Sequence, residues 1–259
     1  MFDLDAQTLV ITGAAGGLGS AMAEMFVGLG ATVALTDLES SDGAEEAEAL
    51  NGAHFFAMDV TDKADTERAA REIVERLGPV TGVVANAGIA PTAPSLDYAL
   101  DTWNKVIAIN QTGVFLTAQT FGRLMVENAQ AENAFGISGR GAMVLTSSIA
   151  GLAVVHPERH VAYGASKAAV AHMAALLGVE WARKGIRVNA IAPGYIDTPI
   201  LDKMKEEDPE TVAEWKAAIP IGRLLDPREV AAACAFLLSP AASAITGTVL
   251  SCDGGYAAA

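Results

Sequence analysis

The stretch Thr12-Gly13-Ala14-Ala15-Gly16-Gly17-Leu18-Gly19 decides the fold through its place in the chain. It follows an apolar, β-branched run at 8–12 that is typical of a buried strand, and it leads into a helical pattern at 17–29. A turn in this position brings the backbone close to a pyrophosphate at a helix N-terminus. A glycine cluster without this context would indicate only a turn. We therefore predict a dinucleotide-binding turn, with Gly13, Gly17, Leu18 and Gly19 against the nucleotide.

Strand and helix patterns alternate along almost the whole chain. Apolar runs rich in β-branched residues, each typical of a buried strand, lie at 8–12, 32–36, 54–58, 80–85, 142–147, 187–192 and 246–251. Helical patterns suited to crossover connections lie at 17–29, 43–50, 63–77, 102–128, 161–183 and 227–238. Right-handed crossovers then favour an α/β fold with a doubly wound, Rossmann-type parallel sheet of about seven strands and helices on both faces. No composition shift marks a second domain, so we predict one dinucleotide-binding and catalytic domain over 1–259.

Two segments interrupt this alternation. Residues 128–141, rich in Gly, Ser and Asn, indicate an exposed loop before the fifth strand. In residues 194–226, prolines bracket a charged helical stretch around 203–216. A mobile flap beside a binding site has this composition, and we predict a substrate flap there.

An acidic residue, Asp37, ends the second predicted strand eighteen residues after Gly19. Its carboxylate can accept hydrogen bonds from both ribose hydroxyls of a dinucleotide, and it would repel a 2′-phosphate. Neither 14–16 nor 38–41 contains an Arg or Lys that would offset this repulsion. We therefore predict NAD rather than NADP as the cofactor. Loops after the third and fourth strands add further nucleotide contacts, at Asp59, Val60, Asn86, Ala87 and Gly88.

Tyr163 and Lys167 stand four residues apart in a helical pattern, so their side chains share one face. A positive charge about 4 Å from a phenol, at an effective dielectric of about 20, favours the phenolate by about 4 kcal/mol, or roughly three pH units. We therefore predict that Tyr163 is a proton acceptor near neutral pH.

Together these motifs resemble the short-chain dehydrogenase/reductase family over essentially the whole chain. The resemblance rests on the glycine pattern at 12–19, on Asn86-Ala87-Gly88, Asn110, Ser148 and Tyr163-x-x-x-Lys167, and on Pro193-Gly194 with Thr198 following. It implies that Ser148 polarises the substrate oxygen, that Tyr163 exchanges its proton and that Lys167 binds the nicotinamide ribose. It also implies that Asn110 anchors a water relay, and that the cofactor contacts include Tyr163, Lys167, Pro193, Gly194, Ile196 and Thr198.

The segment that leads to Tyr163 departs from the family pattern. The run Ser148-Ile149-Ala150-Gly151 matches the family better than a run from Ser147, which then supplies a cofactor-side or structural hydroxyl. The stretch up to Tyr163 is a couple of residues longer than usual, and it contains His156 and His160. This loop could contact substrate, hold a metal, or form a solvated or subunit contact. Pro157 and the loop context argue against a metal, and we predict none.

These residues predict an enzyme that interconverts a secondary alcohol and a ketone, because Tyr163 can take the alcohol proton while the nicotinamide accepts the hydride. NAD and the polar 156–160 loop favour a sugar, a polyol or a cyclic alcohol. A 3-oxoacyl thioester reductase or 3-hydroxyacyl dehydrogenase is the alternative, although an acidic carrier needs a basic partner surface. A non-catalytic NAD-binding sensor or scaffold is a further alternative, but it would be free to lose the catalytic residue types present here.

The 259 residues include 31 acidic and 17 basic ones, a formal charge of −14 that would repel nucleic acid and anionic membranes. We therefore predict a small-molecule substrate. The first ten residues lack the basic charge of a signal peptide, and the apolar segment 168–179 is too short to span a bilayer. Cys234 and Cys252 indicate buried free thiols, which favours the cytoplasm. Excess apolar surface on the helices at 102–128 and 161–183 favours association. The resemblance to the family, whose members commonly form tetramers through the equivalent helices, implies a homotetramer, with a dimer as the alternative.

Overall fold

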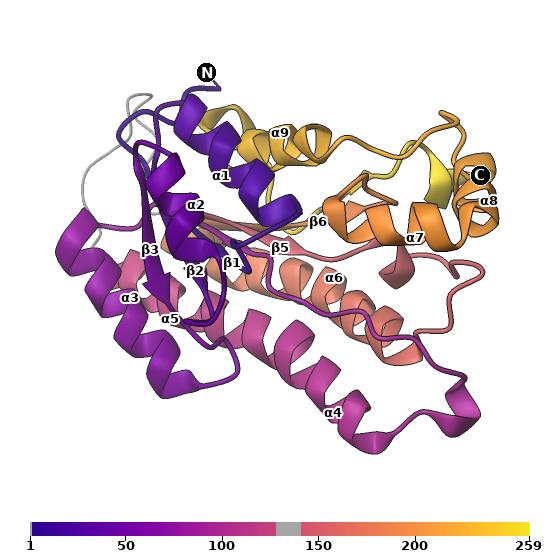
Figure 1. Ribbon diagram of the computed structural model, residues 1–259. Helices are drawn as coiled ribbons and strands as arrows, with labels where there is room; N and C mark the ends of the chain where they lie inside the picture. The colour runs from indigo at the N-terminus through magenta and orange to yellow at the C-terminus, as the bar shows by residue number, and fades with distance from the viewer. Residues whose placement is uncertain (1, 128–140) are drawn as a thin grey trace.

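Parallel strands form one sheet in the computed structural model, which describes residues 2–127 and 141–259. The strands are β1 Thr8–Thr12, β2 Thr32–Asp37, β3 Ala53–Ala57, β4 Gly82–Ala85, β5 Gly141–Thr146, β6 Ile186–Pro193 and β7 Val249–Cys252. Their order across the sheet is β3-β2-β1-β4-β5-β6-β7 (Figure 1). The predicted Rossmann-type parallel sheet of seven strands is thus confirmed. The predicted loop at 128–141 lies outside the described residues, apart from Gly141, which begins β5.

Helices cover both faces of the sheet (Figure 1). On one face lie α1 (Leu18–Gly28), α2 (Gly43–Ala49) and α9 (Pro227–Leu238). On the other lie α3 (Lys63–Leu77), α5 (Val114–Glu127) and α6 (Val161–Trp181), with α4 (Leu100–Ile107) against α6. The segment after β6 forms α7 (Asp202–Glu207) and α8 (Pro209–Ala218). Short 3₁₀ turns lie at Ser95–Asp97, Ile149–Gly151, Ala182–Lys184, Pro199–Leu201, Pro240–Ala242 and Tyr256–Ala258. No described helix is both long and apolar enough to cross a membrane.

The single helix predicted at 102–128 is interrupted. Between α4 and α5 the backbone forms a π-helical segment, Ala108–Gly113. Gly113 packs against Val60, where a Cβ on the glycine would lie 2.8 Å from a Val60 methyl carbon. Thr117 then donates its hydroxyl hydrogen bond to the Gly113 carbonyl. Such π segments are local bulges that frequently occur at functional sites, and this one carries Asn110.

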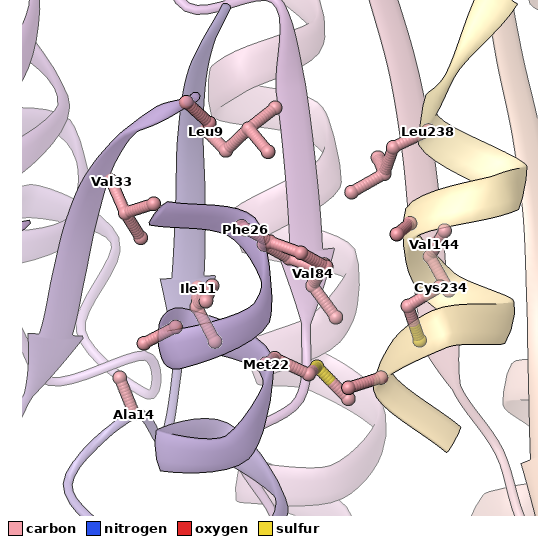
Figure 2. Packing of buried hydrophobic residues seen from close by; sticks show 14 of the residues in the cluster. Leu9, Ile11, Ala14, Met22, Phe26, Val33, Val84, Val144, Cys234 and Leu238 are labelled. Carbon is pink, nitrogen blue, oxygen red and sulfur yellow. The ribbon is translucent and has the colours of Figure 1, made fainter. Parts of the chain in front are cut away.

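Two apolar cores lie on opposite faces of the sheet, because successive strand side chains point to opposite sides. On one face Leu9 of β1 packs with Phe26 of α1 and Leu238 of α9 (Figure 2). Its neighbour Val10 points to the other face, where it joins Phe121 of α5. The sheet is thereby held between two helix layers, and the loops at the strand ends are left to build a binding site.

Both cysteines are free thiols, as predicted, but they differ in burial. Cys234 of α9 is fully buried, whereas Cys252 at the end of β7 is only partly buried. The prediction that Cys252 is buried is therefore wrong. The reason is that β7 is an edge strand whose residues are only half covered.

Candidate active site

A cavity of about 1180 Å³ lies along the carboxyl ends of the strands, where ligands of open parallel sheets bind. Most residues that the sequence predicted for the cofactor or the chemistry line it: Gly13, Gly17, Leu18, Asp37, Asp59, Val60, Asn86, Ala87, Gly88, Ser148, Tyr163, Lys167, Pro193, Gly194, Ile196 and Thr198. Gly19 and Asn110 do not line it. Residues far apart in the sequence therefore meet in one place.

The glycine-rich turn after β1 depends on three glycines. Gly13 has a φ of 63° and lies so close to the loop after β4 that a Cβ would sit 2.7 Å from the Ala87 Cα. Gly17, with a φ of 54°, precedes α1. A Cβ on Gly19 would lie 2.4 Å from the Gly13 carbonyl oxygen, so Gly19 lets α1 pack against the turn rather than contact a ligand. The backbone of the turn can therefore approach a phosphate at the start of α1.

Asp37 is fixed beside this turn at the end of β2. Its carboxylate accepts hydrogen bonds from the backbone N–H of Ala15 at 3.0 Å and from that of Leu38 at 2.8 Å. Carboxylate oxygens have further lone pairs, so Asp37 can still accept from ribose hydroxyls. An acidic acceptor next to the N-terminus of α1 fits the ribose and the pyrophosphate of a dinucleotide.

Ser148 and Tyr163 form a hydrogen-bonded pair in the same cavity. Ser148 ends the extended segment after β5, and its hydroxyl oxygen also accepts from the Ala150 N–H at 3.2 Å. Tyr163 is on the first turn of α6. Burial raises the pKa of the Tyr163 phenol above its ordinary value, and the hydrogen bond with Ser148 acts in the opposite direction.

Lys167 lies one helical turn further along α6 and is almost fully buried. Its ammonium group donates to the Thr146 carbonyl oxygen at 2.7 Å and lies 5.6 Å from the centre of the Tyr163 ring. Burial lowers the pKa of Lys167 to about 8. Enclosure disfavours the charged form of both groups and outweighs the effect of this ammonium on the Tyr163 phenol, so the role of Tyr163 as proton acceptor stays a prediction.

The Asn110 side chain is fully buried and hydrogen-bonded within the protein. Its Oδ1 accepts from the Ile89 N–H at 2.9 Å, and its Nδ2 donates to the Ile89 carbonyl at 2.9 Å and to Ser166 Oγ at 3.2 Å. Asn110 thus ties the π segment to the loop after β4 and to α6. The Ser147 hydroxyl is structural in this arrangement, because it donates to the Lys167 carbonyl at 2.7 Å.

Further polar and aromatic side chains line the cavity beyond the predicted set. We call four of them the acidic–aromatic cluster: Glu158, His160, Tyr195 and Trp215. The only sequence signal for Glu158 and His160 was the polar 156–160 loop, within a stretch before Tyr163 that is a couple of residues longer than usual, and a substrate contact was one of its open roles. Tyr195 follows the predicted Pro193-Gly194 pair. Trp215 had no signal beyond its place in the predicted flap.

An acid–base pair placed in one cavity with a nucleotide-binding turn is what an enzyme needs to move a proton and a hydride together. The fold and the site thus define a nicotinamide-dependent oxidoreductase of the Rossmann class.

Comparisons with known proteins place the chain within this class. Residues 13–257 match a family model described as Enoyl-(Acyl carrier protein) reductase. The galactitol 2-dehydrogenase (L-tagatose-forming) of Cereibacter sphaeroides is 40% identical over 99% of this chain and 97% of its own length. The NAD-dependent glycerol dehydrogenase of Listeria innocua is 38% identical over 98% and 95%. The crystal structure of a gluconate 5-dehydrogenase from Burkholderia cenocepacia, in complex with NADP and tartrate, has a TM-score of 0.89 and 28% identity, covering 100% of this chain and 98% of that one. This protein belongs to the short-chain dehydrogenase/reductase family.

Proposed function

We propose that this protein catalyses the NAD-dependent, reversible oxidation of a secondary alcohol group of a polyol or sugar to a ketone. The observation that carries the proposal is the Ser148–Tyr163 hydrogen bond in a cavity that also contains Asp37 and the glycine turn. One cavity thus holds groups suited to the reacting alcohol and to a dinucleotide.

Ser148 and Tyr163 are the residues that handle the substrate oxygen. A substrate hydroxyl that pairs with both groups is oriented by Ser148 and gives its proton to Tyr163 as the carbon–oxygen double bond forms. When bound, the oxidised nicotinamide supplies a hydride acceptor and a positive charge. The Lys167 ammonium adds positive charge on the ring side of Tyr163, which lowers the cost of the phenolate.

Asp37 supports NAD over NADP. Its carboxylate is held at the end of β2 by two backbone N–H groups, and the exposed apolar Leu38 follows it instead of a basic residue. A 2′-phosphate placed here would meet a like charge without a cation to offset it. Two of the similar proteins differ in their cofactor: the glycerol dehydrogenase is named as NAD-dependent, and the gluconate 5-dehydrogenase was crystallised in complex with NADP.

A polyol is the substrate class that the comparisons and the cavity support together. The galactitol and glycerol dehydrogenases act on polyols according to their names. The acidic–aromatic cluster supplies polar groups beside the Ser148–Tyr163 pair. The second candidate is the oxidoreduction of an acyl thioester, because the matching family model is described by an acyl-carrier substrate.

The test is a substrate and cofactor survey of the purified protein. We expect NADH formation from galactitol, glycerol or related polyols, with kcat/KM at least about tenfold higher for NAD than for NADP, which corresponds to about 1.4 kcal/mol. A 3-hydroxyacyl thioester oxidised more efficiently than every polyol would favour the second candidate. Cofactor binding without turnover of any alcohol would favour the non-catalytic alternative.

A further inference from the structure

The acidic–aromatic cluster is connected by contacts within the cavity. The Tyr195 hydroxyl donates to Glu158 Oε2 at 3.0 Å, and its ring stacks on the Trp215 indole with 4.8 Å between centroids. The His160 ring lies 5.1 Å from the ring of Tyr163. The cluster therefore lies in the cavity next to Tyr163, the proposed proton acceptor. Its residues come from segments as distant in sequence as the 156–160 loop and α8.

Three polar atoms of this cluster lack a hydrogen-bond partner in the part of the chain that the structure describes: Glu158 Oε1, His160 Nε2 and Trp215 Nε1. All three are closed to water, and buried polar atoms are nearly always paired in folded proteins. Three such atoms in one cavity-lining cluster indicate a ligand that supplies the missing partners. A ligand that pairs with these three atoms displaces no protein hydrogen bond from them.

The chemistry of the three atoms matches hydroxyl groups. Glu158 Oε1 can only accept, Trp215 Nε1 can only donate, and a neutral imidazole nitrogen can do either. Burial lowers the pKa of His160, which favours its neutral ring. A hydroxyl group both donates and accepts, so several hydroxyls on one substrate can serve all three atoms, whereas a hydrocarbon chain can serve none.

Glu158 also gives this part of the cavity a negative charge. The other acidic lining residues are Asp37, which ends β2, and Asp59, which follows β3, both at the nucleotide-binding loops. Of the lining lysines, Lys167 is bonded to a backbone carbonyl, and Lys105 of α4 is exposed to solvent. A substrate carboxylate near Glu158 would meet a like charge in a half-buried place, where screening is weak.

We propose that Glu158 determines the specificity of the proposed reaction, by accepting hydrogen bonds from hydroxyls remote from the reacting carbon and by excluding sugar acids. Tyr195 is its positioning residue. This inference rests on the proposed function and goes beyond it, since it separates neutral polyols from aldonates such as the substrate that names the gluconate 5-dehydrogenase.

Glu158→Gln tests the inference, because it keeps the shape of the side chain and removes its charge. We expect the wild-type protein to prefer galactitol to D-gluconate in kcat/KM with NAD, and Glu158→Gln to reduce this preference at least about tenfold, mainly through a higher KM for galactitol. Glu158→Asp should keep most of the rejection of gluconate. Tyr195→Phe should raise the KM for galactitol, as Glu158→Gln does, and should change kcat less than KM.

The matched control is Glu214→Gln, which removes the same charge from an exposed position on α8 outside the cavity. It should leave the galactitol-to-gluconate ratio unchanged. A ratio in Glu158→Gln within twofold of the wild-type ratio, or a wild-type protein that prefers gluconate, would overturn the inference while leaving the proposed function intact.

Calorimetric titration of galactitol into the protein with NADH provides a readout without turnover. Tighter binding to the wild-type protein than to Glu158→Gln supports the inference, and equal binding contradicts it. Absence of NADH formation from every alcohol, with wild-type protein still binding galactitol more tightly than gluconate, would overturn the proposed function and retain the role of Glu158 in recognition.

Discussion

Burial of the charged Lys167 ammonium group lowers the free energy of unfolding. Its side chain is 3% exposed, and burial lowers its pKa to about 8, well below the ordinary value of 10.5. Between these two values the unfolded chain binds a proton at this lysine that the folded chain has released. The contribution of Lys167 to stability therefore rises with pH from about 8 to about 10.5 and is lost as the pH falls through 8.

Replacement of Lys167 by Met should remove this pH dependence. We expect the free energy of unfolding of the wild-type protein, relative to that of Lys167→Met, to increase by about 2–3 kcal/mol between pH 7 and pH 10. Urea unfolding at both pH values measures the difference. Tyr163, whose pKa is raised, and Arg187, whose pKa is lowered to about 10, are present in both proteins and should cancel. A difference that stays constant with pH would show that the pKa of Lys167 is not lowered by folding.

Asp37 controls the cofactor in this account, so its charge should be separable from its place in the fold. We expect Asp37→Ala to lower the kcat/KM ratio of NAD to NADP at least about tenfold, because both the ribose contacts and the repulsion of a 2′-phosphate are lost. Glu39→Gln, which removes a charge two residues away outside the cavity, is the control. An unchanged ratio in Asp37→Ala would refute the assignment.

At the scale of elements, the segment formed by α7 and α8 packs apart from the two cores of the sheet. It has its own small core, in which Trp215 packs with Val212, Ile219 and Leu224, separate from the two cores of the sheet. Segments with few contacts to the main core open at low free-energy cost. We therefore keep the proposal of a substrate flap over 194–226.

Limited proteolysis tests the flap. Trypsin should cleave at Lys205 or Lys216, and NAD together with galactitol should slow this cleavage at least about fivefold, because ligand binding stabilises the closed segment. Cleavage after Arg76, on α3, serves as the internal control. Equal rates at Lys205 and Lys216 with and without ligands would contradict the proposal.

The elements differ in how far the sequence could predict them. The nucleotide turn could be predicted because Gly13, Gly17 and Asp37 are spaced along the chain by one β-turn-α-β unit. The π segment around Asn110 could not, since it depends on the close contact of Gly113 with Val60 and on distant hydrogen-bond partners. The same limit applies to Trp215, whose meeting with Glu158 through Tyr195 depends on tertiary packing. The Tyr163–Lys167 spacing predicted proximity but not burial, and burial reversed the expected direction of the phenol's pKa.

At the scale of the whole molecule, exposed apolar side chains gather on the helices predicted to associate. Leu176 and Val179 of α6 are 59% and 77% exposed, and Leu100 of α4, just before the predicted helix at 102–128, is 70% exposed. Phe115 of α5 is partly exposed as well. Apolar surface of this kind marks association surfaces in oligomeric proteins. The homotetramer, like the single domain and the cytoplasmic location, stays a prediction.

Light scattering measures the assembly directly. We expect a mass of four times the 26.6 kDa chain, and Val179→Asp should lower it because a charge would be buried in the interface. Lys184→Asp, at a 3₁₀ turn beyond the end of α6, is a control for an added acidic residue. A monomer mass for the wild-type protein would contradict the prediction.

The central claim is that Tyr163 exchanges the proton of the alcohol, and Tyr163→Phe tests it most directly. The variant removes one oxygen atom and leaves the ring, Asp37 and the glycine turn in place. We expect NADH formation from galactitol to fall at least about a thousandfold, while NAD binding measured by calorimetry stays within a few-fold of the wild-type value. Turnover by Tyr163→Phe within tenfold of the wild-type rate would contradict the mechanism.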